Sequence, residues 1–449
     1  MERYCRFAGF SLFFLLVFLL FPFPASAQAG EGKTRGDYLT LKIAVMGPGD
    51  ELYFWWGHIA LVIEDSLSGE GHFYDYGLFS FENDHFFLNF ATGRLLYSCG
   101  VSLSETNYRV YRRTNRDITL YTLDLPPARR EEIRRFAETN VLPENRDYYY
   151  HHFRDNCSTR IRDIIDLATG GQFKERFGRA PGRFTLRQHV RRHTWFAPFS
   201  DWILNFWMGQ DIDTPITVWD EMFLPSEVGE RIQGFEYTDD EGLKRPLVSG
   251  TEILNRAVNR PRVLDAPRRQ WIRELILACF LAAFMAGLSV FRGIRPGLGG
   301  TLWGIAQAGF GLFFGLAGTL LVFLSFFTDH DYTYHNINVL FVNPLFFAAL
   351  VWGIRYAFPG SDRRGLGFLL KCFWTYVFVA GLLTMPLKLL PFFWQQNQVT
   401  QALLLPPAFV LSLFPGMLVG LFHVLNNRIQ TMRFKKNINH EGAQRHTKT

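Results

Sequence analysis

Residues 148–171 read YYYHHFRDNCSTRIRDIIDLATGG, and this pattern predicts a helix that begins at Cys157. Asp155 and Asn156 are residue types that accept hydrogen bonds from the N–H groups of a first helical turn. Apolar residues then repeat at helical spacing, and two glycines end the helix. A thiol at a helix N-terminus lies beside unpaired N–H donors, which stabilise a thiolate and an oxyanion. We therefore expect Cys157 to be a nucleophile; the alternative is a small buried thiol or half of a disulfide.

A second stretch, WWGHIALVIED at residues 55–65, supplies the base that a thiol nucleophile needs. His58 begins an apolar strand directly after Gly57, so its ring can project from the edge of a sheet. His72 and Asp75, on the next strand, are candidates for orienting His58 through its other ring nitrogen. A structural His58 is one alternative. Zinc binding is another, but the spacing is not typical of a metal site, and we expect no metal and no cofactor. The histidines considered for zinc are His58, His72, His85, His151 and His152.

The remaining pattern of residues 28–255 predicts an α+β domain. Strands are expected where short runs alternate or are wholly apolar, at 41–47, 58–65, 72–77, 95–103, 108–113 and 118–125. Helices are expected at 127–141, 185–195 and 201–208, and within 220–232. Outside the apolar blocks, Cys99 and Cys157 are the two cysteines of this domain, and they could pair if the compartment is oxidising.

Residues 1–27 have the three parts of a secretory signal peptide. Arg3 and Arg6 precede the apolar block LFFLLVFLLF, and the small residues Ala25-Ser26-Ala27 predict cleavage before Gln28. The segment therefore places the following domain outside the cytosol. If it were retained as an anchor, its basic end would give the same orientation.

Residues 271–425 are almost free of charge and predict a membrane domain of about five helices, at 271–291, 301–327, 337–358, 366–390 and 402–423. Basic residues lie in the expected cytosolic segments and in the tail at 426–449, which agrees with the positive-inside rule. The second span carries small residues on one helical face, where another helix can approach closely. They are Gly304, Ala308, Gly311, Gly315 and Gly318.

The linker at 256–270 is rich in arginine and precedes the first span. We interpret it as a collar that faces phosphates at the outer leaflet; a solvated linker is the alternative. Its arginines, with one in the span, are Arg256, Arg260, Arg262, Arg268, Arg269 and Arg273. The net charge of +6 comes from this cluster and the tail, so it indicates lipid headgroups and excludes nucleic acid as the favoured partner.

A polar loop, TDHDYTYHNINVLFVNP at 328–344, joins spans two and three on the same side as the soluble domain. His330, Asn336 and Asn338 are the residues of this loop that we expect to bind substrate. A polar rim of this kind can meet a lipid headgroup or the catalytic domain. A merely solvated turn is the alternative.

An early histidine on a strand and a later cysteine on a helix resemble the circularly permuted branch of the NlpC/P60 papain-like superfamily, which includes the lecithin:retinol acyltransferase group. WGH at 56–58, YDYG at 74–77, the DNCSTR stretch and FLP at 223–225 are more specifically similar to the Lnb-type lipoprotein N-acyltransferases. FTDH and HNIN in the hydrophobic half are similar to the membrane part of some of these proteins. Asp75 stands where an Asn is expected.

The resemblance implies a papain-like extracytoplasmic domain followed by an all-α polytopic membrane domain, with Cys157 as nucleophile and His58 as base. It implies transfer of a fatty-acyl chain from the diacylglyceryl group to the α-amine of a lipoprotein's N-terminal cysteine. The partners would be diacylated lipoproteins and membrane lipid at the cytoplasmic membrane. Around Cys157 and in the loop, the expected substrate-binding residues are Trp56, Asp75, Tyr76, Tyr150, Asp155, Asn156, Arg160, His330, Asn336 and Asn338.

Two other classes of function fit the same residues. In a hydrolase of cell-wall peptides or phospholipid esters, water would resolve the acyl-enzyme, and the membrane helices would only anchor the domain. In a non-catalytic membrane binding or assembly factor, Cys157 would be structural.

Overall fold

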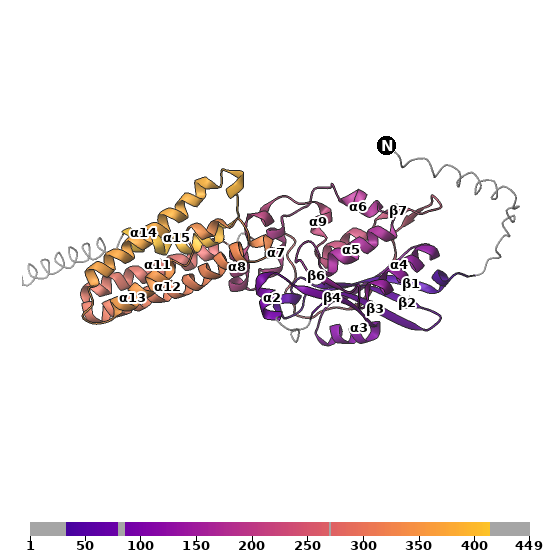
Figure 1. The fold of residues 1–449 in the computed structure, drawn as a ribbon, viewed down its shortest axis with the longest axis horizontal. Helices are drawn as coiled ribbons and strands as arrows, with labels where there is room; N and C mark the ends of the chain where they lie inside the picture. The colour runs from indigo at the N-terminus through magenta and orange to yellow at the C-terminus, as the bar shows by residue number, and fades with distance from the viewer. Residues whose placement is uncertain (1–32, 80–85, 269–270, 414–449) are drawn as a thin grey trace, which may run out of the picture.

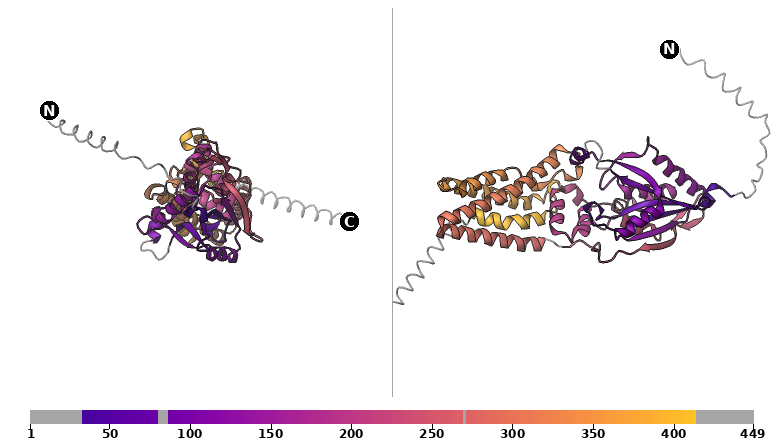
Figure 2. Two further views of the ribbon diagram at one scale, coloured as in Figure 1. Left: turned by 90° about the vertical axis from the view of Figure 1, so that its right-hand side faces the viewer. Right: turned by 90° about the horizontal axis from the view of Figure 1, so that it is seen from below.

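The structure is a computed structural model that describes residues 33–79, 86–268 and 271–413. An N-terminal α/β domain sits at one end of an elongated molecule, and a bundle of apolar helices forms the other end (Figures 1 and 2). The expected signal peptide at 1–27 and the cytosolic tail at 426–449 lie outside the described residues, as does the end of the last expected span.

The α/β domain is built on a seven-stranded antiparallel sheet in the order β6-β4-β3-β2-β1-β5-β9. Its strands are β1 (Leu39–Met46), β2 (His58–Asp65), β3 (Glu70–Leu78), β4 (Leu96–Leu103), β5 (Ile118–Leu123), β6 (Asp147–Tyr149) and β9 (Val248–Asn255). A separate hairpin pairs β7 (Glu236–Thr238) with β8 (Lys244–Pro246). The strands expected at 41–47, 58–65, 72–77, 95–103 and 118–125 are therefore confirmed to within a few residues.

Successive side chains of a strand project to opposite faces of the sheet, and both faces of this sheet are apolar. Helices α4 (Pro127–Asn140) and α5 (Cys157–Ala168) pack on one face, where Ile133 and Ile161 join a core with Leu61. Helix α3 (Ser104–Arg113) packs on the other face, where Tyr108 contacts a smaller core with Phe73. Both faces of the central strands are thus buried, which fixes the ends of β2 and β3 that carry the candidate site.

The strand expected at 108–113 is wrong, because these residues belong to α3. YRVYRR alternates in the manner of a strand, yet Tyr108 and Tyr111 are also three residues apart, which places both on one face of a helix. Tyr108 is buried and Tyr111 packs beside it against the sheet. A six-residue run cannot distinguish the two periods.

The α/β domain also contains shorter helices that lie between or beyond its strands. They are α2 (Phe86–Thr92), α6 (Gln172–Phe177), α7 (Leu186–Thr194), α8 (Pro198–Trp207), α9 (Val218–Glu221) and α10 (Pro225–Ile232), with 3-10 turns η1 (Arg35–Tyr38), η2 (Leu52–Phe54) and η3 (Gln210–Asp213). The helices expected at 185–195, 201–208 and within 220–232 correspond to α7, α8 and α10. Helices α2 and α8 lie at the end of the domain that faces the bundle (Figure 1).

Among the described residues, three helices are long and apolar enough to cross a membrane: α11 (Trp271–Ile294), α12 (Pro296–Phe327) and α14 (Arg363–Leu387). The helices α13 (Phe346–Ala357) and α15 (Gln398–Leu413) are apolar but shorter. The 3-10 turns η4 (Asp331–Thr333), η5 (Ile337–Leu340) and η6 (Pro391–Phe393) lie between them. Part of the third expected span, 337–358, is thus a turn followed by a helix of 12 residues. Five crossings remain a prediction.

The small residues of α12 form the contact that the sequence predicts. A Cβ atom added to Gly311 would lie 2.2 Å from the backbone nitrogen of Leu350 on α13, and one added to Gly304 would lie 2.7 Å from that of Ala357. Glycine at these positions lets the two backbones touch, as is common between membrane helices.

The arginine-rich linker only partly fits the expected collar. Arg260 pairs with Asp50 at 2.9 Å and donates to the carbonyl of Thr114, so its guanidinium binds the α/β domain. Arg268 lies over the ring of Trp195, at 4.4 Å from the ring centre. Arg269 lies outside the described residues. Arg260 is therefore a structural residue rather than a phosphate ligand.

Candidate active site

Cys157 is the first residue of α5, as the sequence predicts. Asn156 caps this helix: its Oδ1 accepts from the backbone N–H groups of Ser158 at 2.8 Å and Thr159 at 3.0 Å. These bonds use two of the N–H donors of the first helical turn, so these two donors are not available to an oxyanion. Across the described residues, the amide of Cys157 itself has no hydrogen-bond acceptor. The thiol therefore lies beside one available backbone donor at the positive end of α5.

The side-chain amide of Asn156 also joins two other segments to the start of α5. Its Nδ2 donates to the carbonyls of His152 at 2.7 Å and of Phe223 at 3.0 Å. Asn156 is buried, with 4% of its surface exposed. Both of its polar atoms are occupied within the protein, so Asn156 positions Cys157 and does not bind substrate directly. Phe223 belongs to the FLP stretch at 223–225, one of the motifs similar to the Lnb-type proteins, so this hydrogen bond links that motif to the start of α5.

His58 is the first residue of β2 and is held by Asp75. Its Nε2 lies 2.6 Å from Oδ1 of Asp75, and both side chains are about 15% exposed. Gly57, at φ +83°, makes the turn that leads into the strand, and a Cβ there would lie 2.7 Å from the carbonyl of Met46. The pairing with Asp75 leaves Nδ1 of His58 as the nitrogen that can take a proton.

The predicted role of Asp75 in orienting His58 thus has the required geometry, whereas the prediction for His72 is wrong. Asp75 is opposite Ala60 in the sheet register, on the same face as His58. Because side chains alternate between faces, His72 projects to the opposite face. The carboxylate of Glu70 lies 3.8 Å from the His72 ring.

Electrostatics link His58 to Cys157. Burial lowers the pKa of His58, but Tyr111, Asp75 and Cys157 raise it, and the pKa lies well above its ordinary value. The raised pKa makes His58 a stronger proton acceptor than an ordinary histidine. Within the described part of the chain, no hydrogen bond joins the Cys157 thiol to His58.

The end of β3 brings the two halves of the site together. Gly77 has φ +94°, and a Cβ there would lie 3.8 Å from Cβ of Cys157 and 3.7 Å from the ring of Tyr150. Tyr150 stacks on Tyr97 with ring centres 4.3 Å apart. Both aromatic rings therefore belong to the surroundings of the thiol, and a role for Tyr150 in binding substrate stays a prediction.

The other residues expected around Cys157 have structural roles. Asp155 binds Arg160 through two hydrogen bonds of 2.6 and 2.8 Å, and Arg160 lies over the ring of Tyr148 at 4.2 Å. Tyr76 is 2% exposed and belongs to the core. Trp56 is partly buried against the apolar cluster that contains Phe153 and Phe223.

Cys99 and Cys157 are both free thiols, so the disulfide considered above is absent. Cys99 is buried, and its Sγ donates to the carbonyl of Asn140 at 2.9 Å. Burial raises the pKa of the Cys99 thiol, as expected for an unreactive cysteine. For the described residues, no group of three or more His, Cys, Asp or Glu side chains could hold a metal ion.

The loop after α12 docks against the segment that leads into Cys157. Asp331 accepts hydrogen bonds from Nε2 of His151 at 2.7 Å and from Arg154 at 2.9 Å. The other ring nitrogen of His151 accepts from the backbone N–H groups of Phe153 and Arg154, at 3.1 and 3.0 Å. The hydrogen bond from His151, opposed by burial, lowers the pKa of Asp331. The His151 ring therefore connects the membrane domain to the turn before Cys157.

The three loop residues expected to bind substrate are engaged in this junction instead. His330 donates from Nε2 to the carbonyl of Phe90 at 2.9 Å. The amides of Asn336 and Asn338 donate to the carbonyl of Phe206, at 2.9 and 3.1 Å. All three are buried, so the loop meets the α/β domain, and contact with this domain was one of the two roles expected for the loop. Sequence reasoning missed the pairing of Asp331 with His151, although it noted the polar loop.

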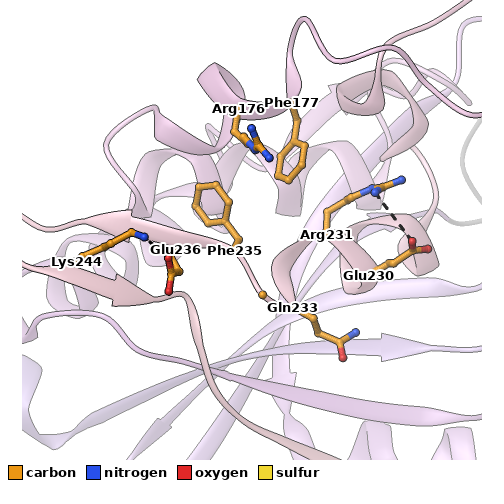
Figure 3. A pocket seen from close by; sticks show the side chains of 9 residues that line it. Arg176, Phe177, Glu230, Arg231, Gln233, Phe235, Glu236 and Lys244 are labelled. Atoms are coloured by element: carbon orange, nitrogen blue, oxygen red, sulfur yellow. Dashed lines mark ion pairs between the residues drawn. The ribbon is translucent and has the colours of Figure 1, made fainter.

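A cavity of about 460 Å³ lies between α6, α10 and the β7–β8 hairpin, and none of the expected site residues lines it (Figure 3). It is lined by Arg176, Phe177, Glu230, Arg231, Gln233, Gly234, Phe235, Glu236 and Lys244. Several of its charges pair with each other, as Lys244 does with Glu236. The cavity is therefore separate from the thiol.

We expect Asp331→Ala to loosen the turn before Cys157, because it removes the acceptor that fixes the His151 ring. Hydrogen bonds to charged groups contribute about 1.5–3 kcal/mol, which corresponds to roughly tenfold or greater acceleration of local amide exchange. Hydrogen exchange of peptides covering 148–160, followed by mass spectrometry, measures this. Asp329→Ala is the matched control, because its exposed ion pair with Arg94 contributes little. Equal exchange in both variants would contradict the assigned role of Asp331.

Two family models match the chain, in the order of an extracytoplasmic and a membrane domain. The Lnb N-terminal periplasmic domain matches residues 26–192, and the Lnb transmembrane domain matches residues 269–411. No curated protein and no solved structure matches the chain. The papain-like arrangement therefore stays a prediction. Because the two models together match well over half of the chain, the protein belongs to the Lnb family, with an extracytoplasmic N-terminal domain followed by a transmembrane domain.

Proposed function

We propose that this protein is a thiol acyltransferase of the cytoplasmic membrane. It moves a fatty-acyl chain from the diacylglyceryl group to the α-amine of a lipoprotein's N-terminal cysteine. Cys157 is the nucleophile, His58 is the general base, and Asp75 orients His58. The observation that carries this proposal is a histidine–carboxylate pair beside a cysteine at a helix N-terminus, in a domain that docks on a membrane bundle.

In the first half-reaction, His58 takes the proton of the Cys157 thiol. The thiolate attacks the carbonyl carbon of a glyceryl ester, and the N–H of Cys157 stabilises the oxyanion. The ester C–O bond then breaks, and His58 returns the proton to the departing glyceryl oxygen. The products are a thioester on Cys157 and a lyso-glyceryl lipoprotein. Catalytic hydrogen bonds often form only when substrate binds, so this step does not require a Cys157–His58 hydrogen bond in the free protein.

In the second half-reaction, the free α-amine of the same lipoprotein attacks the thioester. His58 accepts the proton that the amine loses, the C–S bond breaks, and the thiol is restored. The net change converts an ester into an amide and consumes neither water nor a cofactor. An intramolecular acceptor is favoured because the amine and the ester belong to one bound molecule, which raises their effective concentration.

The docking of the two domains supports a membrane substrate over a wall peptide. Asp331 and His330, from the loop between α12 and α13, contact the turn and helix that flank the site. A simple anchor would not need contacts from that loop to the turn that positions the nucleophile. The membrane domain is thus suited to hold the lipid-linked end of a lipoprotein near Cys157.

We expect Cys157→Ser to abolish N-acylation and His58→Ala to lower its rate by about 10²–10⁴-fold, since each removes a group that acts on the reacting atoms. The measurement is mass spectrometry of the N-terminal lipopeptide of an abundant lipoprotein, in cells without another N-acylating enzyme. Wild type should give the N-acylated lyso form, and the variants the diacylglyceryl form with a free amine.

Cys279→Ser is the matched control, because Cys279 is an exposed thiol in α11. It should behave as wild type. If Cys157→Ser also gives the N-acylated form, Cys157 is not the nucleophile. If wild type leaves the diacylglyceryl form unchanged, the transferase proposal is wrong for this substrate.

We also expect Asp75→Asn to lower the pKa of His58, because it removes a negative charge and keeps the side chain's shape. Burial lowers this pKa, and in the variant the charge of Asp75 no longer offsets the effect of burial. NMR titration of labelled histidine rings in detergent measures the change. Asp155→Asn is the control, because it makes the same change in charge at a carboxylate that pairs with Arg160 and not with His58. An unchanged His58 pKa in Asp75→Asn would refute the orienting role.

A further inference from the structure

The helix α8 belongs to the extracytoplasmic part of the chain but packs with the membrane helices. Its Trp202 and Phe206 share an apolar core with Met285 of α11 and Phe314 of α12. The N–H of the Trp207 ring points to the carbonyl of Ala317, at 3.5 Å. Neither family model covers residues 193–268, so α8 is not part of either matched domain.

The position of α8 along α12 places it at the depth of the bilayer. Helix α12 begins at Pro296, directly after Arg295, and Phe313 is 17 residues further on. A rise of 1.5 Å per residue puts Phe313 about 26 Å from that end. The hydrocarbon core of a bilayer is about 30 Å thick, so Phe313 lies just within its outer edge.

A line of aromatic rings connects this lipid-facing surface to α8. Phe313 is 43% exposed on α12, and its ring stacks on Trp202 with centres 5.8 Å apart. The Trp202 ring lies 6.0 Å from that of Phe199, which is 62% exposed. Phe199 therefore continues the apolar surface of a membrane helix onto the catalytic domain. Exposed aromatic residues at this level are typical of the membrane interface.

The C-terminal end of α8 has its carbonyl groups satisfied without water. Arg187 donates to the carbonyls of Asn205, Met208 and Gly209, at 2.6, 3.0 and 2.6 Å. Amide side chains of the membrane domain supply most of the remaining donors, to the carbonyls of Phe206, Trp207 and Met208. These are Asn336, Asn338 and Gln395.

The last carbonyls of a helix are normally left to solvent or to a capping motif. Ala317, which the Trp207 ring contacts, lies about 32 Å from Pro296 along α12, at the border of the hydrocarbon core. Carbonyls that the bundle shields from water there must be paired within the protein, because an unpaired buried polar group costs several kcal/mol. Asp213 completes the arrangement by neutralising Arg187 at 2.8 Å, with both side chains fully buried. The paired helix end is therefore built for a site that water does not reach.

We propose that α8 lies in the outer leaflet of the membrane, with Phe199 facing lipid acyl chains, and holds the catalytic domain at the bilayer surface. The partner is membrane lipid. This proposal stands on packing and does not require the acyl transfer. Combined with the proposed function, it keeps the catalytic domain next to the bilayer that holds a lipid-linked ester.

The test uses a nitroxide label on Phe199→Cys in the full chain, reconstituted into phosphatidylcholine nanodiscs, with Cys5, Cys157, Cys279 and Cys372 changed to Ser. Collision rates with oxygen, which concentrates in lipid, and with a water-soluble nickel chelate give the depth. Leu312→Cys, on α12 and 46% exposed, is the lipid reference. Leu67→Cys, in the turn after β2 and 61% exposed, is the water reference.

The Phe199 label should resemble the Leu312 label, with oxygen collisions favoured over nickel. Pro198→Cys, the neighbouring exposed residue of α8, gives a second reading if a label at Phe199 disturbs the packing. Nickel collisions at both α8 positions equal to those at Leu67 would overturn the proposal. Because the labelled protein carries no Cys157, the result is independent of whether the transferase reaction occurs.

Discussion

The side-chain amide of Asn156 is the interaction on which the site depends. This one amide group caps α5 and donates to the carbonyls of His152 and Phe223, so three segments meet at the residue before Cys157. Asn156 is buried, and losing either set of bonds would leave polar groups unpaired. The same bonds use two first-turn donors, which leaves the amide of Cys157 as the donor free for an oxyanion.

The junction between the domains extends this constraint to the membrane. Asp331 fixes the His151 ring, and that ring holds the turn that Asn156 anchors. On the other side, Asn336 and Asn338 pair with the end of α8. The α/β domain is thus attached to the bundle at two places, one at the turn before Cys157 and one at the end of α8. This arrangement supports the proposal of a lipid-linked substrate over a wall peptide.

The sequence could predict the elements whose signals are local. The cap and periodicity at 156–168 predicted α5, and apolar alternation predicted the central strands. The strand predicted for YRVYRR was wrong because the pattern of these six residues fits both a strand and a helix. The orienting role predicted for His72 was wrong because the side chain projects to the opposite face of the sheet from His58. The face depends on the register between strands, which the sequence does not give. Asn336 and Asn338 looked like substrate ligands because polar residues in a membrane loop suggest function; their partners, carbonyls of α8, are more than 120 residues away. Papain-like topology and five crossings remain predictions.

The central claim is that Cys157 carries the acyl chain. The most direct measurement incubates the purified protein with a diacylglyceryl lipopeptide whose α-amine is blocked by acetylation, so that no amine can resolve the intermediate. Peptide mass spectrometry should then find one fatty-acyl mass on the peptide containing Cys157, and hydroxylamine, which cleaves thioesters, should remove it. An acyl group on another residue, or an intact substrate with an unmodified Cys157, would contradict the account.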